Sequence, residues 1–318
     1  MIERLLERAP LTSPEVEGVV AGLLDPGVPD AHKAGVLVAL RARGDAPDEL
    51  RMLADEMLAR AVPVELGEVL DTAGTGGDGS GSLNFSTAAA LVAAACGVPV
   101  AKHGNRAVSS QCGSADVLEA LGIPLATDPA TARDQLARHG FTFLLAPAFH
   151  PSTRALGPAR RALGVRTTFN LLGPLTNPAR PAFQLIGAAT PAAAERLAGA
   201  ARGHTWVVHG APGWDEATPV GPFRVWSGGE VRQLDPLDLG IPRCSPDALS
   251  GGAPVVNAER LRAVFDGERG PARDTTVLNA ALALSLARGA ALPEAVAAAS
   301  RALDDGRTRR LVAALSAP

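Results

Sequence analysis

Five glycines stand within the eight residues Gly74–Gly81, and the sequence Asn-Phe-Ser-Thr follows at 84–87. Glycine leaves backbone N–H groups uncovered and lets another molecule approach the main chain closely, so this loop could hold an anion. Ser86 and Thr87 stand at the expected start of a helix over 88–95, where free amides and the helix dipole also favour negative charge. The stretch therefore predicts a phosphate or pyrophosphate site.

Gly74–Gly79 also fits the G-x-G-x-x-G pattern of dinucleotide-binding folds. That pattern needs a helix that opens within it and an acidic residue about 20 residues later. Here Ser80–Asn84 come before any helix, and Lys102 and His103 stand where the acid should be, which disfavours a dehydrogenase. A Walker loop is excluded because no Gly-Lys-Ser/Thr closes the motif. A plain glycine-rich turn with Ser86 as the helix cap explains one serine but not the five glycines.

A second polar loop follows the apolar run Val98–Ala101. It joins two cations to neutral donors, at Lys102, His103, Asn105, Arg106, Ser109 and Ser110. The chain has only two lysines and six asparagines, so Lys102 and Asn105 are informative at this place. This composition suits a strongly anionic ligand that also carries ribose hydroxyls. A lone histidine such as His103 is more often a packed core residue.

Asp215 and Glu216 lie just beyond the apolar run Thr205–His209. Adjacent carboxylates are usually an exposed surface pair. A phosphate-rich ligand held by few cations needs a hard divalent ion, however, and Mg²⁺ binds through one or two carboxylates, substrate oxygens and water. Asp215 and Glu216 are therefore candidate Mg²⁺ ligands, and Ser86 could supply a further oxygen.

These loops must be positioned by the elements around them. Residues 1–65 have the pattern of helices, which predicts a small helical domain joined by inserted helices around 150–175. From residue 66 to 318, short apolar runs alternate with helical stretches, which predicts an α/β domain with a mostly parallel sheet. The expected strands are Val69–Ala73, Val98–Ala101, Phe141–Ala146, Phe183–Ala188 and Thr205–His209. One buried helix is expected over Leu278–Ala299. In such a sheet, ligands bind where strands end and loops enter the next helix.

The whole chain has the composition of a globular protein, with 318 residues, 47% hydrophobic residues and a net charge of −3. This balance points away from a nucleic-acid partner. No segment has the pattern of a signal peptide or a membrane span. The three cysteines, Cys96, Cys112 and Cys244, lie far apart without a C-x-x-C pair, which favours reduced thiols in the cytoplasm.

Taken together, these stretches resemble the anthranilate phosphoribosyltransferase family of tryptophan biosynthesis. The resemblance is carried by GTGGDG (74–79), NFST (84–87), KHGNR (102–106), SADVLEALG (114–122), HPSTR (150–154), RTTFNLLGPLTNPA (166–179) and VVHG with DE (207–216). It implies a nucleoside-phosphorylase-like transferase fold, a homodimer, and the substrates 5-phosphoribosyl-1-pyrophosphate (PRPP) and anthranilate with Mg²⁺. A pyrimidine nucleoside phosphorylase or a nucleic-acid-binding relative of the family are the alternatives.

The resemblance also implies which residues form the site. PRPP contacts fall at Gly74, Gly77, Asp78, Ser82, Asn84, Phe85, Ser86, Thr87, Lys102, His103, Gly104, Asn105, Arg106, Ala107, Val108, Ser109, Ser110 and Ser114. Anthranilate contacts fall at Gly74, Asn105 and Arg160, and Mg²⁺ ligands at Ser86, Asp215 and Glu216. No general base is implied, although His103 or His150 could accept the departing proton or simply border the anthranilate tunnel.

The sequence departs from the family pattern in two places. Ser82-Leu83 stands where the family usually has Thr-Phe, so the hydroxyl is kept and an aromatic contact is lost. Pro212 and Trp214 replace the usual Asp and Leu beside the acidic pair. The expected reaction is attack of the anthranilate amino nitrogen on C1 of the ribose, with inversion and loss of pyrophosphate.

Overall fold

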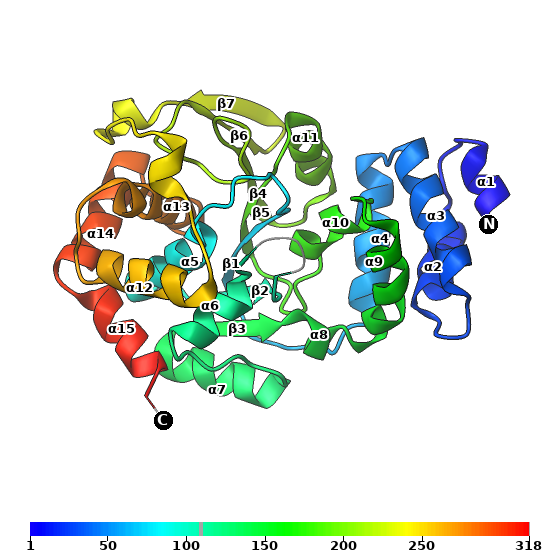
Figure 1. Ribbon diagram of the computed structural model, residues 1–318, viewed down its shortest axis with the longest axis horizontal. Helices are drawn as coiled ribbons and strands as arrows, with labels where there is room; N and C mark the ends of the chain where they lie inside the picture. The colour runs from blue at the N-terminus through cyan, green and yellow to red at the C-terminus, as the bar shows by residue number, and fades with distance from the viewer. Residues whose placement is uncertain (108–110, 318) are drawn as a thin grey trace.

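The computed structural model describes residues 1–107 and 111–317. Figure 1 shows a bundle of helices at one end of the molecule and a sheet enclosed by helices at the other. The bundle contains α1 (Ile2–Leu6), α2 (Ser13–Leu24), α3 (Asp30–Arg43) and α4 (Pro47–Ala59). A later segment packs against it, built from α8 (Ala146–Phe149), η1 (Pro151–Leu156), α9 (Gly157–Leu163), α10 (Phe169–Leu172) and η2 (Gly173–Leu175). We call residues 146–175 the insert.

The sheet of the larger part has seven strands in the order β3-β2-β1-β4-β5-β6-β7. Its strands are β1 (Leu70–Gly74), β2 (Val100–Gly104), β3 (Phe141–Leu145), β4 (Phe183–Gly187), β5 (His204–His209), β6 (Phe223–Ser227) and β7 (Glu230–Leu234). Neighbours from β3 to β5 pair in parallel, and β6 and β7 are antiparallel. The mostly parallel sheet expected from the sequence is confirmed.

Helices cover both faces of the sheet. They are α5 (Phe85–Ala95), α6 (Ser114–Ala120), α7 (Pro129–His139), α11 (Pro191–Ala200), α12 (Pro254–Phe265), α13 (Pro271–Arg288), α14 (Leu292–Asp304) and α15 (Arg307–Leu315), with the short turns η3 (Pro236–Leu239) and η4 (Pro246–Leu249) between them. On β4, Leu185 packs into the core with α5 and α13, whereas Ile186 packs into the core with α11 and the N-terminal helices. Successive side chains of the strand therefore pack into two separate cores, one on each face of the sheet.

The expected single helix over Leu278–Ala299 is wrong. The chain forms α13 and α14 instead, because α13 ends at Gly289, whose φ of 66° is the left-handed conformation of a helix C-cap. No single helix among the described residues is long and apolar enough to cross a membrane. Among the described residues only α13 and α14 taken together reach that length and apolar composition, and the chain bends by 120° between them.

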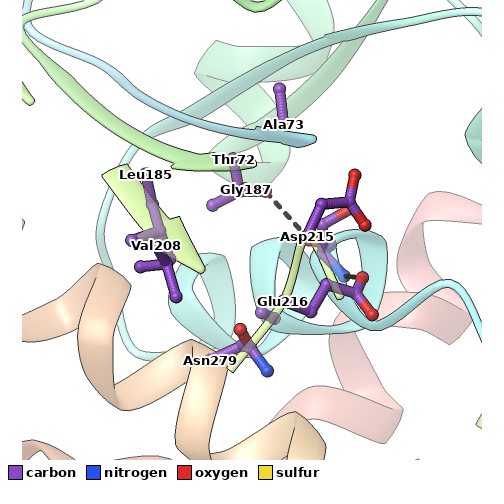
Figure 2. A pocket seen from close by; sticks show the side chains of 10 residues that line it. Thr72, Ala73, Leu185, Gly187, Val208, Asp215, Glu216 and Asn279 are labelled. Carbon is purple, nitrogen blue, oxygen red and sulfur yellow. Dashed lines mark hydrogen bonds between the residues drawn. The ribbon is translucent and has the colours of Figure 1, made fainter. Parts of the chain in front are cut away.

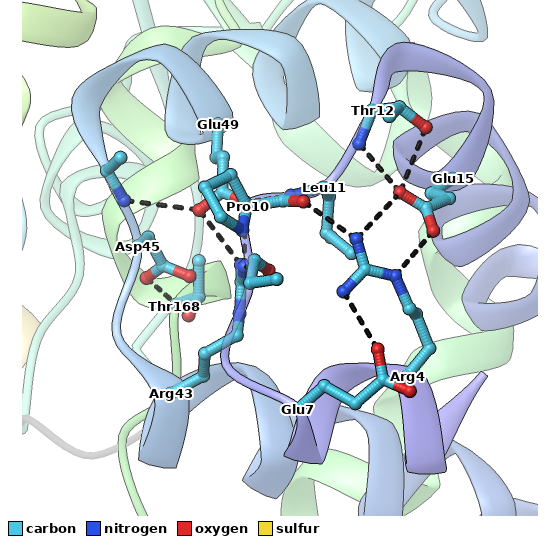
Figure 3. Close-up of polar contacts among 12 residues, drawn as sticks. Arg4, Glu7, Pro10, Leu11, Thr12, Glu15, Arg43, Asp45, Glu49 and Thr168 are labelled. Carbon is cyan, nitrogen blue, oxygen red and sulfur yellow. Dashed lines mark hydrogen bonds and ion pairs between the residues drawn. The ribbon is translucent and has the colours of Figure 1, made fainter.

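Figure 3 shows polar contacts within the N-terminal helices and one, between Thr168 and Asp45, that reaches the insert. Arg43 and Glu49 form an ion pair at 2.7 Å, with side chains only 3% and 5% exposed. Burial opposes the charge on Glu49, but hydrogen bonds from Arg43 and from the Leu11 and Ala46 amides lower its pKa overall. Next to this pair, Thr168 of the insert donates to Asp45 at 2.7 Å. The insert is thus fastened to the helical bundle by specific bonds as well as by apolar packing.

Candidate functional site

The loops after β1 and β5 meet above the end of β4, which lies between these two strands. We call residues 74–81 the glycine loop and residues 210–217 the acidic loop. A Cβ atom on Gly187, at the end of β4, would lie 1.5 Å from the backbone oxygen of Asp215. A Cβ atom on Gly210 would lie 1.9 Å from the backbone oxygen of Glu216. Glycine is required at both positions for the acidic loop to reach the strand ends.

Asp215 is bonded directly to the glycine loop. Its Oδ2 accepts the Gly76 N–H at 2.7 Å, and its own N–H donates to Asp78 Oδ2 at 3.3 Å. A Cβ atom on Gly74 would lie 2.4 Å from Asp215 Oδ2, so that glycine also makes room for the carboxylate. Asp78, predicted to contact PRPP, and Asp215, predicted to bind Mg²⁺, thus lie side by side.

Glu216 turns towards the start of α5. Its Oε1 accepts the Ser86 N–H at 3.0 Å, and Ser82 Oγ donates to its Oε2 at 3.4 Å. The Ser86 hydroxyl in turn accepts a bond from Lys102 Nζ at 3.3 Å, and Lys102 also donates to the Thr72 carbonyl. Ser86 of α5, Lys102 of β2 and Glu216 of the acidic loop therefore form one connected cluster.

Figure 2 shows Asp215 and Glu216 beside one another, beyond the strands that carry Leu185 and Val208. They line a small pocket with Thr72, Ala73, Ser86, Ala89, Leu185, Gly187, Val208 and Asn279. Asn279 of α13 fixes the acidic loop from below, because its side chain bonds both the N–H and the carbonyl of Ala217. Leu185, Val208 and Ala89 make the floor of this pocket apolar.

The two carboxylates of the acidic loop carry an excess of negative charge. Burial and the neighbouring Asp78 carboxylate raise the pKa of Asp215 to about 7. Burial and Asp215 likewise raise the pKa of Glu216 well above its ordinary value. No three His, Cys, Asp or Glu side chains in the described ranges are grouped so as to hold a metal by themselves. Two carboxylates and the Ser86 oxygen fit Mg²⁺, which completes its shell with substrate oxygens and water.

The second predicted loop is only partly described, because Val108, Ser109 and Ser110 lie outside the described residues. Asn105 Oδ1 accepts the Arg106 N–H at 2.8 Å, and Ser114 Oγ donates to the Asn105 carbonyl at 3.3 Å. The Arg106 guanidinium pairs with Glu119 of α6. Asp116, at the start of α6, accepts the N–H groups of Ala107 and Gly113, each at 2.8 Å. These bonds fold the loop back onto α6. Gly104 is enclosed, since a Cβ there would meet Ser114 Oγ at 2.4 Å.

Three residues of the 84–87 motif are placed differently from the sequence-based expectation. Phe85 and Thr87 have no exposed surface, and the Thr87 hydroxyl has no hydrogen-bond partner among the residues that the structure describes. Thr87 therefore does not present its hydroxyl to the loop side, because the first turn of α5 rotates it into the core. The Asn84 side chain is already bonded, donating to the Cys112 carbonyl at 3.2 Å and accepting from Asn257 at 3.0 Å. Asn84 thus ties the glycine loop to the second loop and to α12.

The remaining predicted residues lie on the side of the insert. Arg160 of α9 is exposed, and no bond joins its guanidinium to any residue in the described ranges. His103 and His150 are buried with ring centroids 5.3 Å apart, and a ring nitrogen of His150 bonds the Thr176 carbonyl at 2.8 Å. Burial, then the nearby His150, lowers the pKa of His103 to about 3. Burial also lowers the pKa of His150. Both rings are therefore uncharged at neutral pH.

Sequence reasoning missed several residues that position these loops. Asp71 is buried and accepts the His103 N–H at 3.2 Å and the Asn177 side-chain amide at 2.9 Å. Arg166 of the insert bonds two carbonyls of the glycine loop. Asn177 and Arg166 both stand inside the quoted motif 166–179, but motif matching assigns no role to them. The only sequence feature that could have pointed to Asp71 is an aspartate inside a mostly apolar predicted strand.

Comparison with known proteins matches this architecture. The family model described as "Glycosyl transferase family, a/b domain" matches residues 66–309, and "Glycosyl transferase family, helical bundle domain" matches residues 1–61. A Methylobacterium nodulans protein named anthranilate phosphoribosyltransferase is 46% identical over 97% of this chain and 96% of its own length. One of the same name from Syntrophomonas wolfei is 43% identical over 96% of this chain and 93% of its own length.

Solved structures agree. The anthranilate phosphoribosyltransferase of Thermus thermophilus superposes with a TM-score of 0.92 and is 41% identical, covering 99% of this chain and 98% of its own. The Saccharomyces cerevisiae enzyme in complex with PRPP and Mg has a TM-score of 0.89 and 28% identity, covering 95% of this chain and 92% of its own. The same yeast enzyme has also been solved with 4-fluoroanthranilate, with a TM-score of 0.88 and 26% identity.

Proposed function

Since this chain belongs to the anthranilate phosphoribosyltransferases of the glycosyl transferase family, we propose that it transfers the phosphoribosyl group of PRPP to the amino group of anthranilate. The products are N-(5-phosphoribosyl)anthranilate and pyrophosphate, and the reaction belongs to tryptophan biosynthesis. The observation that carries the proposal is the joining of Asp215 to Gly76 and of Glu216 to Ser86. These two bonds place two carboxylates beside the amide-rich loop that would receive a diphosphate.

We propose that the glycine loop and the first turn of α5 bind the diphosphate of PRPP. Gly76, Gly77, Gly79 and Gly81 all have positive φ, so this stretch turns in ways that other residues rarely adopt. Backbone N–H groups in such a turn form a concave nest for an anion. Lys102 lies buried behind Ser86, where burial lowers its pKa while the Asp71 and Glu216 carboxylates favour its charged form. Donors that are fixed in advance stabilise the charge that develops on a departing pyrophosphate without reorganising during the reaction.

Mg²⁺ would be held by Asp215, Glu216 and the Ser86 hydroxyl, and when bound it would neutralise charge on the diphosphate. The raised pKa values of Asp215 and Glu216 support this assignment, because a cation relieves the repulsion that raises them. The Ser86 and Gly76 amides hold one oxygen of each carboxylate. The other oxygen of Glu216 accepts from the Ser82 hydroxyl at 3.4 Å.

We propose that anthranilate binds on the insert side, with Arg160 as the partner of its carboxylate. Arg160 has no bond to any described residue, so its guanidinium is available to a ligand. The uncharged rings of His103 and His150 would line the aromatic part of the substrate. An aromatic amine is uncharged at neutral pH, so its attack on C1 needs orientation more than a strong base. Either histidine could still accept the proton that leaves the nitrogen.

We further propose a homodimer that acts in the cytoplasm on small molecules and not on nucleic acid. Two apolar residues of the bundle, Leu6 of α1 and Val38 of α3, are 64% and 43% exposed. Their exposure supports a contact between two helical bundles. Reduced cysteines support a reducing compartment, and no disulfide joins the three. We propose that residues 1–65 and the inserted helices around 150–175 form one domain and that the rest of 66–318 forms the other. Closure of these two domains on each other would bring Arg160 to the glycine loop.

A fluorescence assay tests the proposed function. Protein, Mg²⁺ and PRPP are mixed with anthranilate, whose emission should fall as the amine is consumed, and pyrophosphate should appear in equal amount. Omitting PRPP is the control for photobleaching and for simple binding. Unchanged emission with phosphorolysis of a pyrimidine nucleoside would instead support the nucleoside phosphorylase alternative.

A further inference from the structure

Arg166 reaches from the insert to the glycine loop. It stands between α9 and α10, and its guanidinium donates to the Gly76 carbonyl and, at 3.0 Å, to the Thr75 carbonyl. The guanidinium has the planar geometry that can bond two neighbouring acceptors at once. Ninety positions of sequence separate Arg166 from Gly76, so this contact joins two otherwise independent segments.

The backbone that carries Arg166 is held from the other side. Arg41 of α3 donates to the Arg166 carbonyl. The next two residues are also bonded, since the Thr167 N–H donates to Asn170 at 2.8 Å and Thr168 donates to Asp45 at 2.7 Å. Arg166 therefore projects from a segment that is anchored to the helical bundle.

The glycine loop is shaped to receive this side chain. A Cβ atom on Gly77 would lie 1.6 Å from Arg166 Nη1, so the guanidinium occupies the space that a side chain would take. The peptide groups of Gly76 are held from two directions, because its carbonyl accepts from Arg166 and its N–H donates to Asp215 at 2.7 Å. Neighbouring glycines otherwise allow many orientations of these peptides.

We propose that Arg166 is a positioning residue that holds the carbonyls of Thr75 and Gly76 and thereby aims the N–H groups of the glycine loop at the diphosphate of PRPP. A carbonyl turned towards a diphosphate would repel it, so a loop of this composition needs such a restraint. Because Arg166 and Arg160 belong to the same anchored insert, the contact also couples the anthranilate site to the PRPP site. This second part rests on the proposed function, whereas the restraint on the loop does not.

Hydrogen–deuterium exchange of the ligand-free protein tests the restraint. Arg166→Ala should raise exchange of the Gly76 amide about five-fold or more, because the Gly76 N–H shares a peptide group with the Thr75 carbonyl, which loses its bond from Arg166. Arg161→Ala is the matched control, because Arg161 is an exposed arginine of the same insert that bonds no described residue. A folded Arg166→Ala protein with the same exchange as the natural chain overturns the restraint, whether or not the protein transfers phosphoribose.

Kinetics and calorimetry test the consequence for the site. Arg166→Ala should lower kcat/KM for PRPP about ten- to a hundred-fold, with Arg161→Ala near the natural chain and Arg166→Lys recovering only part of the loss. PRPP should tighten binding of 4-fluoroanthranilate in the natural chain and not in Arg166→Ala. Weakened PRPP binding without faster loop exchange would overturn the proposal in favour of direct contact with the diphosphate. Faster exchange with unchanged kinetics and unchanged coupling would overturn its functional part.

Inactivity of the natural chain with PRPP, Mg²⁺ and anthranilate is a different result. It contradicts the proposed function and leaves the exchange experiment on the ligand-free loop as the test of the restraint. Circular dichroism and thermal melting of all three variants show whether they are folded, and Arg166→Lys provides the second variant if Arg166→Ala does not fold.

Discussion

The Asp215 carboxylate accepts the Gly76 N–H at 2.7 Å across 139 positions of sequence. This bond joins the glycine loop and the acidic loop into one structural unit, and the carboxylate that shapes the loop is also a proposed Mg²⁺ ligand. The charge on Asp215 therefore affects the stability of the protein as well as its proposed chemistry.

Replacing both acidic side chains by amides should separate these two effects. Asp215→Asn with Glu216→Gln keeps oxygens that can accept from Gly76 and Ser86 but removes the buried charges. Turnover should fall by at least about a hundred-fold, since charge stabilisation of the leaving group is lost. In EDTA at pH 8, unfolding free energy should rise by about 1 to 3 kcal/mol, because repulsion between buried carboxylates disappears.

The sign of the pH dependence follows from the raised pKa of Asp215. Without metal, the folded natural chain binds more protons than the unfolded one between about pH 4 and pH 7, so its stability falls as the pH rises through that range. The variant should lack this fall, and Mg²⁺ should raise the melting temperature of the natural chain only. Near-normal Mg²⁺-dependent turnover in the variant would remove the metal assignment.

Arg160→Ala should raise the KM for anthranilate about ten- to a hundred-fold, because a charge-assisted bond to the carboxylate is lost. The KM for PRPP should change much less, since the glycine loop is untouched. Steady-state kinetics with each substrate varied in turn make the measurement, with Arg161→Ala as the control on the same helix. Equal increases in both KM values would place Arg160 outside the anthranilate site.

Ser86→Ala should weaken binding of PRPP with Mg²⁺ about five- to fifty-fold, measured by calorimetry. Lys102 keeps its bond to the Thr72 carbonyl in this variant, so the fold should survive. Thr87→Val is the matched comparison, because the buried Thr87 hydroxyl bonds no residue in the described ranges and its removal should leave PRPP affinity unchanged. If Thr87→Val weakens binding as much as Ser86→Ala, the first turn of α5 must rotate when the ligand binds.

His103→Gln should make the protein less sensitive to acid. The pKa of His103 is lowered to about 3, so the unfolded chain binds the additional proton as the pH falls below about 6.5. This group therefore contributes stability that is present above pH 6.5 and is lost on acidification towards pH 3. Between pH 7 and pH 5 the natural chain should lose about 2 kcal/mol more than the variant, as chemical denaturation at each pH would show. Parallel losses in the two proteins would mean that His103 titrates normally.

Much of the architecture could be predicted from the sequence, because short apolar runs and loop glycines are local signals. Gly74–Gly81 follows a strand and stands beside Asp215, as expected of motifs at one edge of a parallel sheet. The hairpin of β6 and β7 was not predicted, since β7 is largely exposed and lacks an apolar run. The break at Gly289 was missed because alanine-rich helices continue on both sides of it.

The parts of the site that escaped prediction depend on contacts between distant segments. Asn257 reaches Asn84 from a helix 173 positions later, and no spacing rule connects the two. Nothing in the sequence around Arg166 distinguishes it from another loop arginine, and only the structure places its guanidinium on the Gly76 carbonyl. Thr87 resembled its neighbour Ser86 in type, and only the rotation of α5 distinguishes a buried hydroxyl from an accessible one.

The strand order has a consequence for how the chain folds. β1 lies between β2 and β4, so its second neighbour, paired through Leu70 and Phe183, is synthesised only after more than half of the protein. Pairing between segments so far apart is slow, because the intervening chain must close before any contact forms. A nascent chain that carries β1 and β2 alone would expose an open sheet edge.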